Sequence, residues 1–307
     1  MAARGLRFMV SGGKKKVEFQ GQRSKRCEVC DRTLVVQRLA RGCLVHRCPL
    51  CGHVVRDVRL CPAGARDQVY GGSEKFDRFR LFFTRRKLLQ LLPQLAKPES
   101  LHVLEVGFGD GQLLRSFQRR NHQVYGVEVS QPQGLQVDQL RYLGAHLYYE
   151  GLERADLPKE RLDLIYMIHV VEHLEDPLRC FRKLFAAARK GALIYLVTPN
   201  GRSAGLRIFG ESWWHLEDPT HLRFFTPQSI CTCLQKAGFS PMRVSAPLLD
   251  SITLEVNSLV RLFHRRGAVM DHVLVRTLDL LLVPTALLSR LLWRDIRPSM
   301  EILARRE

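Results

Sequence analysis

The chain has 307 residues, of which 46% are hydrophobic and 25% are charged. This composition is typical of a folded globular protein and excludes a chain that is disordered throughout. Lys and Arg number 48 against 30 Asp and Glu, and the resulting net charge of +18 favours an anionic partner such as RNA, a phosphorylated sugar or acidic lipid headgroups, unless it only reflects an arginine-rich proteome.

The first 26 residues are predicted to form a basic, flexible tail. They carry eight Lys and Arg residues against one acidic residue, Glu18, and have few periodic apolar positions. We therefore expect a segment that is solvated or that binds along the phosphates of a partner. The tail lacks the apolar core of a secretory signal peptide. Nowhere does the chain reach the roughly 20 uncharged apolar residues that a transmembrane helix needs. These features favour a cytoplasmic protein.

Residues 27–61 are predicted to form a zinc ribbon. Cys27 and Cys30 form one CxxC pair, Cys48 and Cys51 form a second, and 17 residues separate the two pairs. This spacing is typical of a four-thiolate zinc site, in which the ion is structural because no coordination position stays open. A redox role for the pairs is the alternative.

Residues 62–100 are predicted to be a connector followed by N-terminal helices. Residues 62–72 contain Pro and Gly, and the apolar residues Phe76, Phe79, Phe82, Leu88 and Leu89 then recur at helical spacing. The helix is expected to end before the prolines at 93 and 98.

A glycine-rich loop follows the first predicted strand. The apolar run 103–106 leads into Gly107, Gly109 and Gly111, and a helical pattern begins at once. Glycines at such a turn let the backbone approach a ligand, and the start of the next helix offers unpaired N–H groups. Glu128 ends the second predicted strand, where an acidic residue can accept hydrogen bonds from both hydroxyls of a ribose. Together, the loop and Glu128 predict a nucleotide-type site rather than glycines that only allow tight packing.

Strand and helix patterns alternate from residue 101 to the end of the chain. Strands are predicted at 103–106, 124–129, 162–167, 192–197, 239–244 and 300–303, with helices at 111–120 and 177–189. Such alternation is typical of a parallel sheet covered on both faces. A helical insertion is expected at about 248–298, before the last strand.

The insertion contains a strongly apolar stretch at 273–293. Arg276, Asp279, Pro284 and Arg290 interrupt it, so we do not expect it to span a membrane. Two interpretations stay open. The helix lies on a membrane surface or covers a hydrophobic acceptor, or it packs on the domain or on a partner subunit.

The loop segment 103–111 resembles the first motif of class I S-adenosylmethionine-dependent methyltransferases. Residues 162–177 and 197–200 resemble that family's fourth strand with its turn and the end of its fifth strand. Residues 214–227 and 234–239 resemble a segment of the branch that includes ubiquinone-type O-methyltransferases. The resemblance covers roughly residues 70–307 and implies an α/β fold: a Rossmann-like, seven-stranded methyltransferase sheet preceded by the zinc ribbon.

The resemblance also implies which residues bind S-adenosylmethionine. Glu105 and Gly107 would lie near its methionine end, and Glu128 would bind the ribose. The remaining implied positions are Leu152 or Glu153 near the adenine, and Met167 and His169 on the floor beneath the methyl donor. Phe108 departs from the family, which often has a small residue or a cysteine there.

Methyl transfer needs an in-line nucleophile and often a base that removes its proton. The candidates are His169, His173, His215 and His221, with Glu172 and Asp218 nearby. We predict that His221, with His173 and Glu172, deprotonates the acceptor. A second interpretation makes Glu172, His173 and His221 ligands of a divalent ion that lowers the pKa of the acceptor hydroxyl, although relatives of this kind have a further acidic residue where this chain has His169. The third is that these histidines are structural.

The sequence therefore predicts a cytoplasmic methyltransferase, with peripheral membrane attachment as an option, that consists of regions 1–26, 27–61, 62–100 and 101–307. The expected acceptor is a small molecule, a sugar or a lipid-linked molecule, methylated on oxygen. An RNA methyltransferase that docks through the ribbon and tail, and a non-catalytic protein that binds S-adenosylmethionine, are the alternatives. Nitrogen or carbon is the less favoured alternative to oxygen as the methylated atom.

Overall fold

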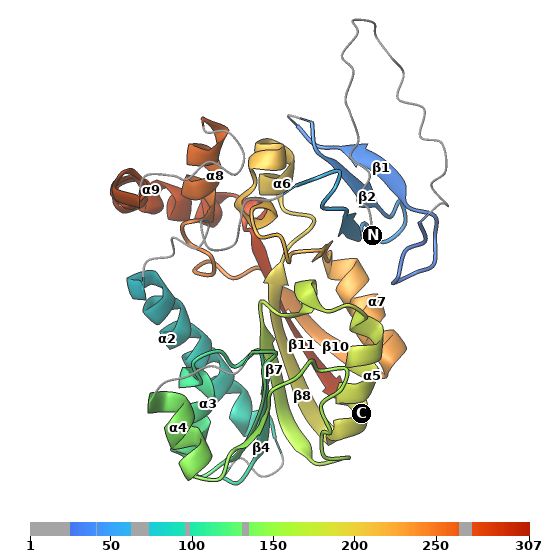
Figure 1. The fold of residues 1–307 in the computed structure, drawn as a ribbon, viewed down its shortest axis with the longest axis vertical. Coiled ribbons are helices and arrows are strands. Elements are labelled where there is room, and N and C mark those ends of the chain that lie inside the picture. Colours follow the sequence, from blue (N-terminus) through green and yellow to red (C-terminus); the bar gives the residue numbers. More distant parts are fainter. Residues whose placement is uncertain (1–24, 41, 63–73, 96–98, 131–134, 264–271) are drawn as a thin grey trace, which may run out of the picture.

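The computed structural model describes residues 25–40, 42–62, 74–95, 99–130, 135–263 and 272–307. They form a large sheet with helices on both faces and a small sheet above one edge of it (Figure 1). Most of the predicted tail and connector lie outside the described residues.

The large sheet has seven strands in the order β10-β11-β8-β7-β4-β5-β6. Its strands are β4 (His102–Val106), β5 (Gln123–Val127), β6 (His146–Tyr148), β7 (Leu162–Ile168), β8 (Ala188–Pro199), β10 (Phe239–Ser245) and β11 (Ser299–Arg306). Strands β6, β5, β4, β7 and β8 run parallel, whereas β11 is antiparallel to β8 and β10 is antiparallel to β11. The predicted seven-stranded sheet of the Rossmann-like methyltransferase fold is confirmed.

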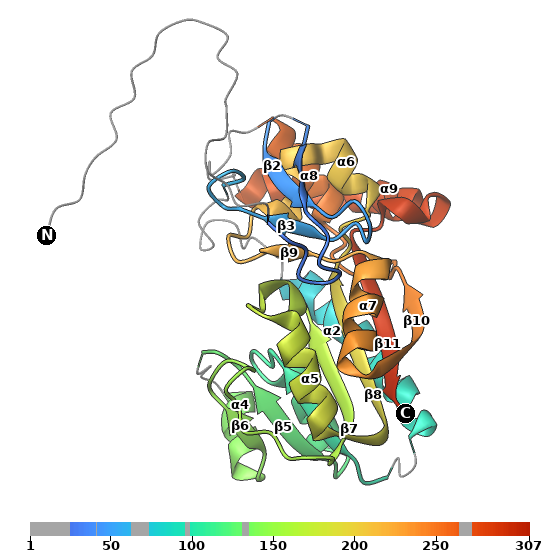
Figure 2. The same ribbon diagram turned by 90° about the vertical axis from the view of Figure 1, so that its right-hand side faces the viewer.

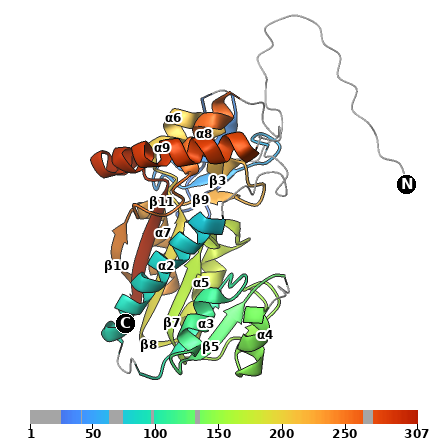
Figure 3. The same ribbon diagram turned by 90° about the vertical axis from the view of Figure 1, so that its left-hand side faces the viewer.

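Two helical layers cover the large sheet. One face carries α2 (Glu74–Leu91), α3 (Gln112–Gln118) and α4 (Leu135–Tyr142), and the other carries α5 (Pro177–Ala187) and α7 (Pro227–Ala237) (Figures 2 and 3). Strand β7 is buried along almost its whole length because side chains from both of its faces meet a helical layer. The carboxyl ends of the parallel strands therefore remain as the edge where a ligand can bind.

Local sequence signals explain where the helices on the second face begin. Asp176 caps α5 by accepting a hydrogen bond from the Arg179 amide at 3.0 Å, and Pro177 occupies the first turn. Thr226 caps α7 in a capping box with Ser229.

The small sheet has the order β1-β2-β3-β9. Strands β1 (Val35–Arg38), β2 (Leu44–Arg47) and β3 (Val54–Arg56) belong to the predicted ribbon, but β9 (Arg223–Phe224) comes from a segment 167 residues after Arg56. A strand of only two residues has no detectable pattern, so the sequence does not predict β9. The ribbon sheet thus incorporates a piece of the methyltransferase region.

Further helices lie over the carboxyl edge of the large sheet. The predicted helical insertion contains α8 (Leu254–Leu262) and α9 (His272–Leu292), and α6 (Ala204–Phe209) lies next to α8 (Figure 1). Short 3-10 turns complete the chain: η1 (Leu92–Gln94), η2 (Val171–His173), η3 (Gly210–Ser212), η4 (Trp214–Leu216) and η5 (Arg294–Ile296). Among the described residues, no helix is both long enough and apolar enough to cross a bilayer.

Candidate active site and cysteine cluster

The glycine loop joins β4 to α3 at the carboxyl edge of the sheet. Gly107, Gly109 and Gly111 all have positive φ angles, of 76°, 50° and 79°. A Cβ atom on Gly107 would lie 2.4 Å from a methyl group of Val170, and one on Gly111 would lie 2.5 Å from a methyl group of Leu140. Gly109 has open space instead. Packing therefore excludes side chains at the first and third positions, and the exposed backbone at Gly109 is free to approach a ligand.

Two predicted acidic residues lie next to this loop. Glu128 follows β5, and its carboxylate accepts hydrogen bonds from the amides of Gly109 at 3.1 Å and Val129 at 2.9 Å. Glu105 is buried in β4 and accepts a hydrogen bond from the Tyr166 hydroxyl at 2.9 Å. Burial raises the pKa of Glu105 well above its usual value, despite the hydrogen bond from Tyr166. Glu128 is thus the carboxylate placed at the open part of the loop, and Glu105 lies in the interior.

Phe108 explains how the loop accommodates a large residue. Its ring is buried against β5, where a Cβ atom on Gly126 would lie 2.6 Å from the ring. Because Gly126 has no side chain, strand β5 leaves room for the large ring of Phe108 in the loop.

The other predicted cofactor residues lie around the same edge in different environments. Leu152 and Met167 are buried in the core on the α5 and α7 face of the sheet. The carboxylate of Glu153 accepts a hydrogen bond from the Cys180 thiol at 3.2 Å.

His169 lies directly after β7, between two buried carboxylates. Its Nδ1 lies 3.3 Å from Glu172 Oε1, and its Nε2 lies 3.0 Å from Asp250 Oδ2. Burial alone would lower the pKa of His169, but the carboxylates of Asp250 and Glu172 outweigh burial and raise it to about 10. His169 is therefore an imidazolium that donates both of its N–H groups. Asp250 was missed at the level of the sequence, since it lies 81 residues away and no motif marks it.

A second cluster joins Glu172, His173 and His221. One ligand atom from each lies within 4.8 Å of the others. His173 Nδ1 lies 3.0 Å from the carbonyl oxygen of Thr220, and His221 Nδ1 lies 2.7 Å from that of His215. Since a carbonyl only accepts, each Nδ1 carries the proton and each Nε2 keeps a lone pair. Burial is the main reason why the pKa of His221 falls to about 4.

Asp218 lies beside this second cluster. Its Oδ2 is 4.0 Å from His221 Nε2 and is buried, with no hydrogen-bond partner in the part of the chain that the structure describes. Two imidazole nitrogens, the Glu172 carboxylate and this oxygen are donors of the kind that bind a divalent ion.

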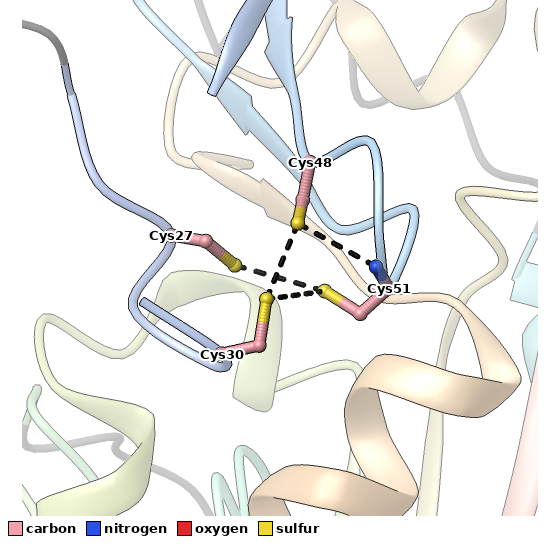
Figure 4. Close-up of side chains that lie close together, drawn as sticks. All are labelled: Cys27, Cys30, Cys48 and Cys51. Atoms are coloured by element: carbon pink, nitrogen blue, oxygen red, sulfur yellow. Dashed lines mark hydrogen bonds between the residues drawn. The ribbon is translucent and has the colours of Figure 1, made fainter. Parts of the chain in front are cut away.

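The four cysteines of the predicted ribbon converge on one point (Figure 4). The Sγ–Sγ distances are 3.6 Å for Cys27 and Cys51, 3.3 Å for Cys30 and Cys48, and 3.7 Å for Cys30 and Cys51. A tetrahedral zinc site with Zn–S bonds of about 2.3 Å has S–S edges of roughly 3.8 Å. The four thiolates therefore fit a structural zinc ion, which would tie the two knuckles of the ribbon together. Cys43 and Cys61 are not part of the tetrad and are buried in a separate core.

Hydrogen bonds connect the ribbon to the segment that carries His221. The buried guanidinium of Arg56 donates to the carbonyl oxygen of Asp218 at 2.7 Å, and the Arg56 amide donates to that of Leu222 at 2.8 Å. The Thr226 hydroxyl donates to the carbonyl oxygen of Cys51 at 2.6 Å. One side of the candidate site is therefore held by the cysteine module.

A cavity of about 320 Å³ lies next to Asp250, the hydrogen-bond partner of His169. Helix α2, strand β8 and residues 247–250 line it, with apolar side chains such as Phe83 and Leu249 and polar ones such as Arg80 and Tyr195. Asp250 also lines it, and this residue connects the cavity to His169.

Comparison with known proteins identifies the family. A family model described as a methyltransferase domain matches residues 76–244, which is more than half of the chain. The chain belongs to the S-adenosylmethionine-dependent methyltransferases. S-adenosylmethionine is the cofactor of this methyltransferase family, as the resemblance implied.

Ubiquinone biosynthesis O-methyltransferases are among the relatives of this methyltransferase. The one from Cereibacter sphaeroides is 29% identical over 47% of this chain and 62% of its own length, so the match spans about three fifths of that relative. The one from Aeromonas salmonicida is 26% identical over 50% of this chain and 71% of its own length.

Solved methyltransferase structures share the fold at low sequence identity. Geranyl diphosphate C-methyltransferase from Streptomyces coelicolor matches with a TM-score of 0.52 and 14% identity, over 73% of this chain and 78% of that one. Phosphoethanolamine N-methyltransferase 2 from Haemonchus contortus matches with a TM-score of 0.50 and 12% identity, over 72% of this chain and 52% of that one.

Proposed function

We propose that the protein transfers the methyl group of S-adenosylmethionine to a hydroxyl oxygen of a small-molecule, sugar or lipid-linked acceptor. Membership of the methyltransferase family supports the donor, and the O-methyltransferase relatives support oxygen as the methylated atom. A cytoplasmic setting is part of the proposal because a zinc-binding cysteine tetrad requires reduced thiols.

The proposal rests on the hydrogen bond that the exposed backbone amide of Gly109 donates to the Glu128 carboxylate, with an N–O distance of 3.1 Å. We propose that Glu128 binds the ribose hydroxyls and that Gly107, Gly109 and Gly111 bring the backbone against the cofactor. Glu105 would lie near the methionine end. The proposed adenine residues are Leu152 and Glu153, and the proposed floor beneath the methyl donor is Met167 and His169.

Calorimetric titration with S-adenosylmethionine and its demethylated product tests the cofactor site. Replacing Glu128 by Ala removes a charged hydrogen-bond acceptor and is expected to weaken binding roughly 10- to 100-fold. Asp138→Ala, a matched change of an exposed carboxylate on α4, should leave the affinity unchanged. Absence of heat from the unaltered protein with both compounds would overturn the proposal.

Two versions of acceptor deprotonation fit the second cluster. In the first, His221, assisted by His173 and Glu172, takes the hydroxyl proton on its unprotonated Nε2. In the second, Glu172, His173 and His221 hold a divalent ion, which when bound would lower the pKa of the acceptor hydroxyl. The two Nε2 lone pairs and the buried Asp218 oxygen support the metal version, and the low pKa of His221, about 4, makes it a weak base.

Binding of Mn²⁺ to the zinc-loaded protein, followed by electron paramagnetic resonance, separates the two versions without requiring an acceptor. The metal version predicts that His221→Ala and Glu172→Gln each weaken Mn²⁺ binding at least about tenfold, since each removes one of few ligands. His146→Ala, an exposed histidine on β6, is the control. If Mn²⁺ does not bind to the unaltered protein, the metal version is wrong, and His221 is then either the base or a structural residue; unchanged turnover in His221→Ala would exclude it as the base.

A further inference from the structure

In the described side chains of α9, from residue 277 onward, several leucines are exposed and both ionisable residues are buried. Asp279 and Arg290 are the only ionisable residues from 277 to 293, and their exposed fractions are 4% and 0%. On the outer side, Leu280 is 76% exposed and Leu292 is 80% exposed. A surface helix of a globular protein normally has the opposite arrangement. The outer side of α9 therefore suits an apolar medium better than water.

The exposed apolar residues of α9 form one continuous face. At 100° per residue, those from Leu280 to Leu292 fall within an arc of roughly 120°, on the side away from Asp279 and Arg290, and Trp293 directly follows the last turn of the helix. We define the α9 face by these residues: Leu280, Leu281, Pro284, Leu288, Leu291, Leu292 and Trp293. It contains no charged residue over more than three helical turns.

Arg290 fixes this orientation of the helix. Its guanidinium donates to the carbonyl oxygens of Leu248, Asp250 and Ser251 at 2.7–2.8 Å and to the Glu255 carboxylate at 2.6–2.7 Å. Rotating α9 to bury its leucines would leave these buried polar groups without partners, which is strongly unfavourable. The outward direction of the α9 face is therefore built into the packing.

The position of α9 leaves its outer face accessible. The helix lies across the end of the molecule above the carboxyl edge of the large sheet (Figures 1 and 3). Neighbouring helices add exposed apolar side chains, namely Ile208 on α6, Leu259 on α8 and Phe263 at its end. Arg207 and Arg294 are exposed beside them.

We propose that the α9 face is a membrane-docking surface that lies in the interface of a bilayer containing anionic lipids. The leucines would enter the boundary between headgroups and acyl chains, and Trp293, with an apolar body and a polar N–H group, suits that depth. The flanking arginines and the net charge of +18 attract acidic headgroups. The same charge makes two copies of the chain repel each other, which favours a membrane over a second copy as the occupant.

Vesicle binding of the full-length, zinc-loaded protein tests the proposal. We expect it to sediment with phosphatidylcholine vesicles that contain about 30 mol % phosphatidylglycerol, and more weakly with pure phosphatidylcholine. The double variant Leu281→Glu and Leu288→Glu should bind at least about tenfold more weakly, because two charges would enter the apolar boundary. The matched control is Tyr142→Glu with Leu143→Glu, two exposed apolar residues at α4, and it should bind like the unaltered protein. Circular dichroism and zinc content check that both variants fold.

Trp293 gives a second readout at the surface itself. Its emission should shift to the blue when anionic vesicles are added, and Trp293→Phe should abolish the shift, since Trp213 is buried and Trp214 is half-buried against a core cluster. Vesicle binding that is unchanged in the leucine variant would overturn the proposal and assign the binding to charge alone. Absence of binding at low salt would overturn it too. A dimer in sedimentation velocity that the leucine variant breaks would assign the α9 face to a second copy.

Discussion

At the scale of single residues, the three glycines after β4 are required for different reasons. A Cβ atom on Gly107 would clash with Val170, and one on Gly111 would clash with Leu140. A Cβ atom on Gly109 would meet open space. The positive φ angles of the three glycines are a property of the local turn, so the glycine motif in the sequence is enough to predict them. Asp250 is different, because its contact with His169 depends on how the insertion folds back over the sheet.

Asp279 provides a pH-dependent test at this scale. Burial raises its pKa from 3.8 to about 6, and its Oδ1 has no hydrogen-bond partner among the described residues. The folded protein therefore binds this proton more tightly than the unfolded chain, so the penalty for burying the charge grows as the pH rises from about 4 to 6 and stays above that range. Asp279→Asn should remove the penalty and raise the free energy of unfolding by up to about 3 kcal/mol at pH 7.5.

Urea unfolding at two pH values checks this prediction. The gain from Asp279→Asn should fall to roughly half at pH 5, where most of the aspartate is protonated in the folded protein but ionised in the unfolded chain. Asp138→Asn on α4 is the exposed control and should have little effect at either pH. A gain that is the same at both values would mean that ionisation of Asp279 is not its cause.

At the scale of elements, β9 joins the cysteine module to the candidate site. Val54 and Val55 of β3 pair with Phe224 and Arg223 of β9. Arg223 also donates to Glu28, which lies between the first two cysteines, at 2.7 Å. The zinc site and the His221 segment are thus parts of one packing unit, although 170 residues separate Cys51 from His221.

Removal of zinc should therefore loosen the candidate site. A chelator, or the variant Cys48→Ser, is expected to raise hydrogen exchange of amides in residues 214–226 by about tenfold or more, because the ribbon loses the ion that organises it. Amides of the central strands β4 and β7 should keep their protection, since their hydrogen bonds lie within the large sheet. Exchange is measured by mass spectrometry on the full-length protein.

The control for this test is Cys231→Ser, a cysteine of α7 outside the tetrad. It should leave exchange in residues 214–226 unchanged. Equal exchange in that segment with and without zinc would contradict the coupling of the ribbon to the site.

At the scale of the whole molecule, the net charge of +18 and the apolar α9 face would both contribute to the proposed binding to anionic membranes. The basic tail at 1–26, on which the RNA alternative depends, lies almost entirely outside the described residues. Deleting the ribbon to test that alternative would also remove the strand partner of β9, and a shorter deletion of residues 1–24 is the cleaner change.

The sequence by itself determined the features that depend on local order. Alternating apolar and helical segments predicted the sheet, because each strand and helix must bury its own apolar residues. Cysteine spacing predicted the tetrad, and the glycines with Glu128 predicted the loop and its acidic partner, because each depends on neighbours in the chain or on a repeated motif.

Only the tertiary structure decided the contacts between distant segments. The pairing of β9 with β3, the position of Asp250 beside His169, and the outward direction of the leucines of α9 all arise from long-range packing. The apolar pattern of a helix does not determine which side of the helix will face the core. Here a buried arginine makes that choice, since its five donors must all find partners when water is excluded.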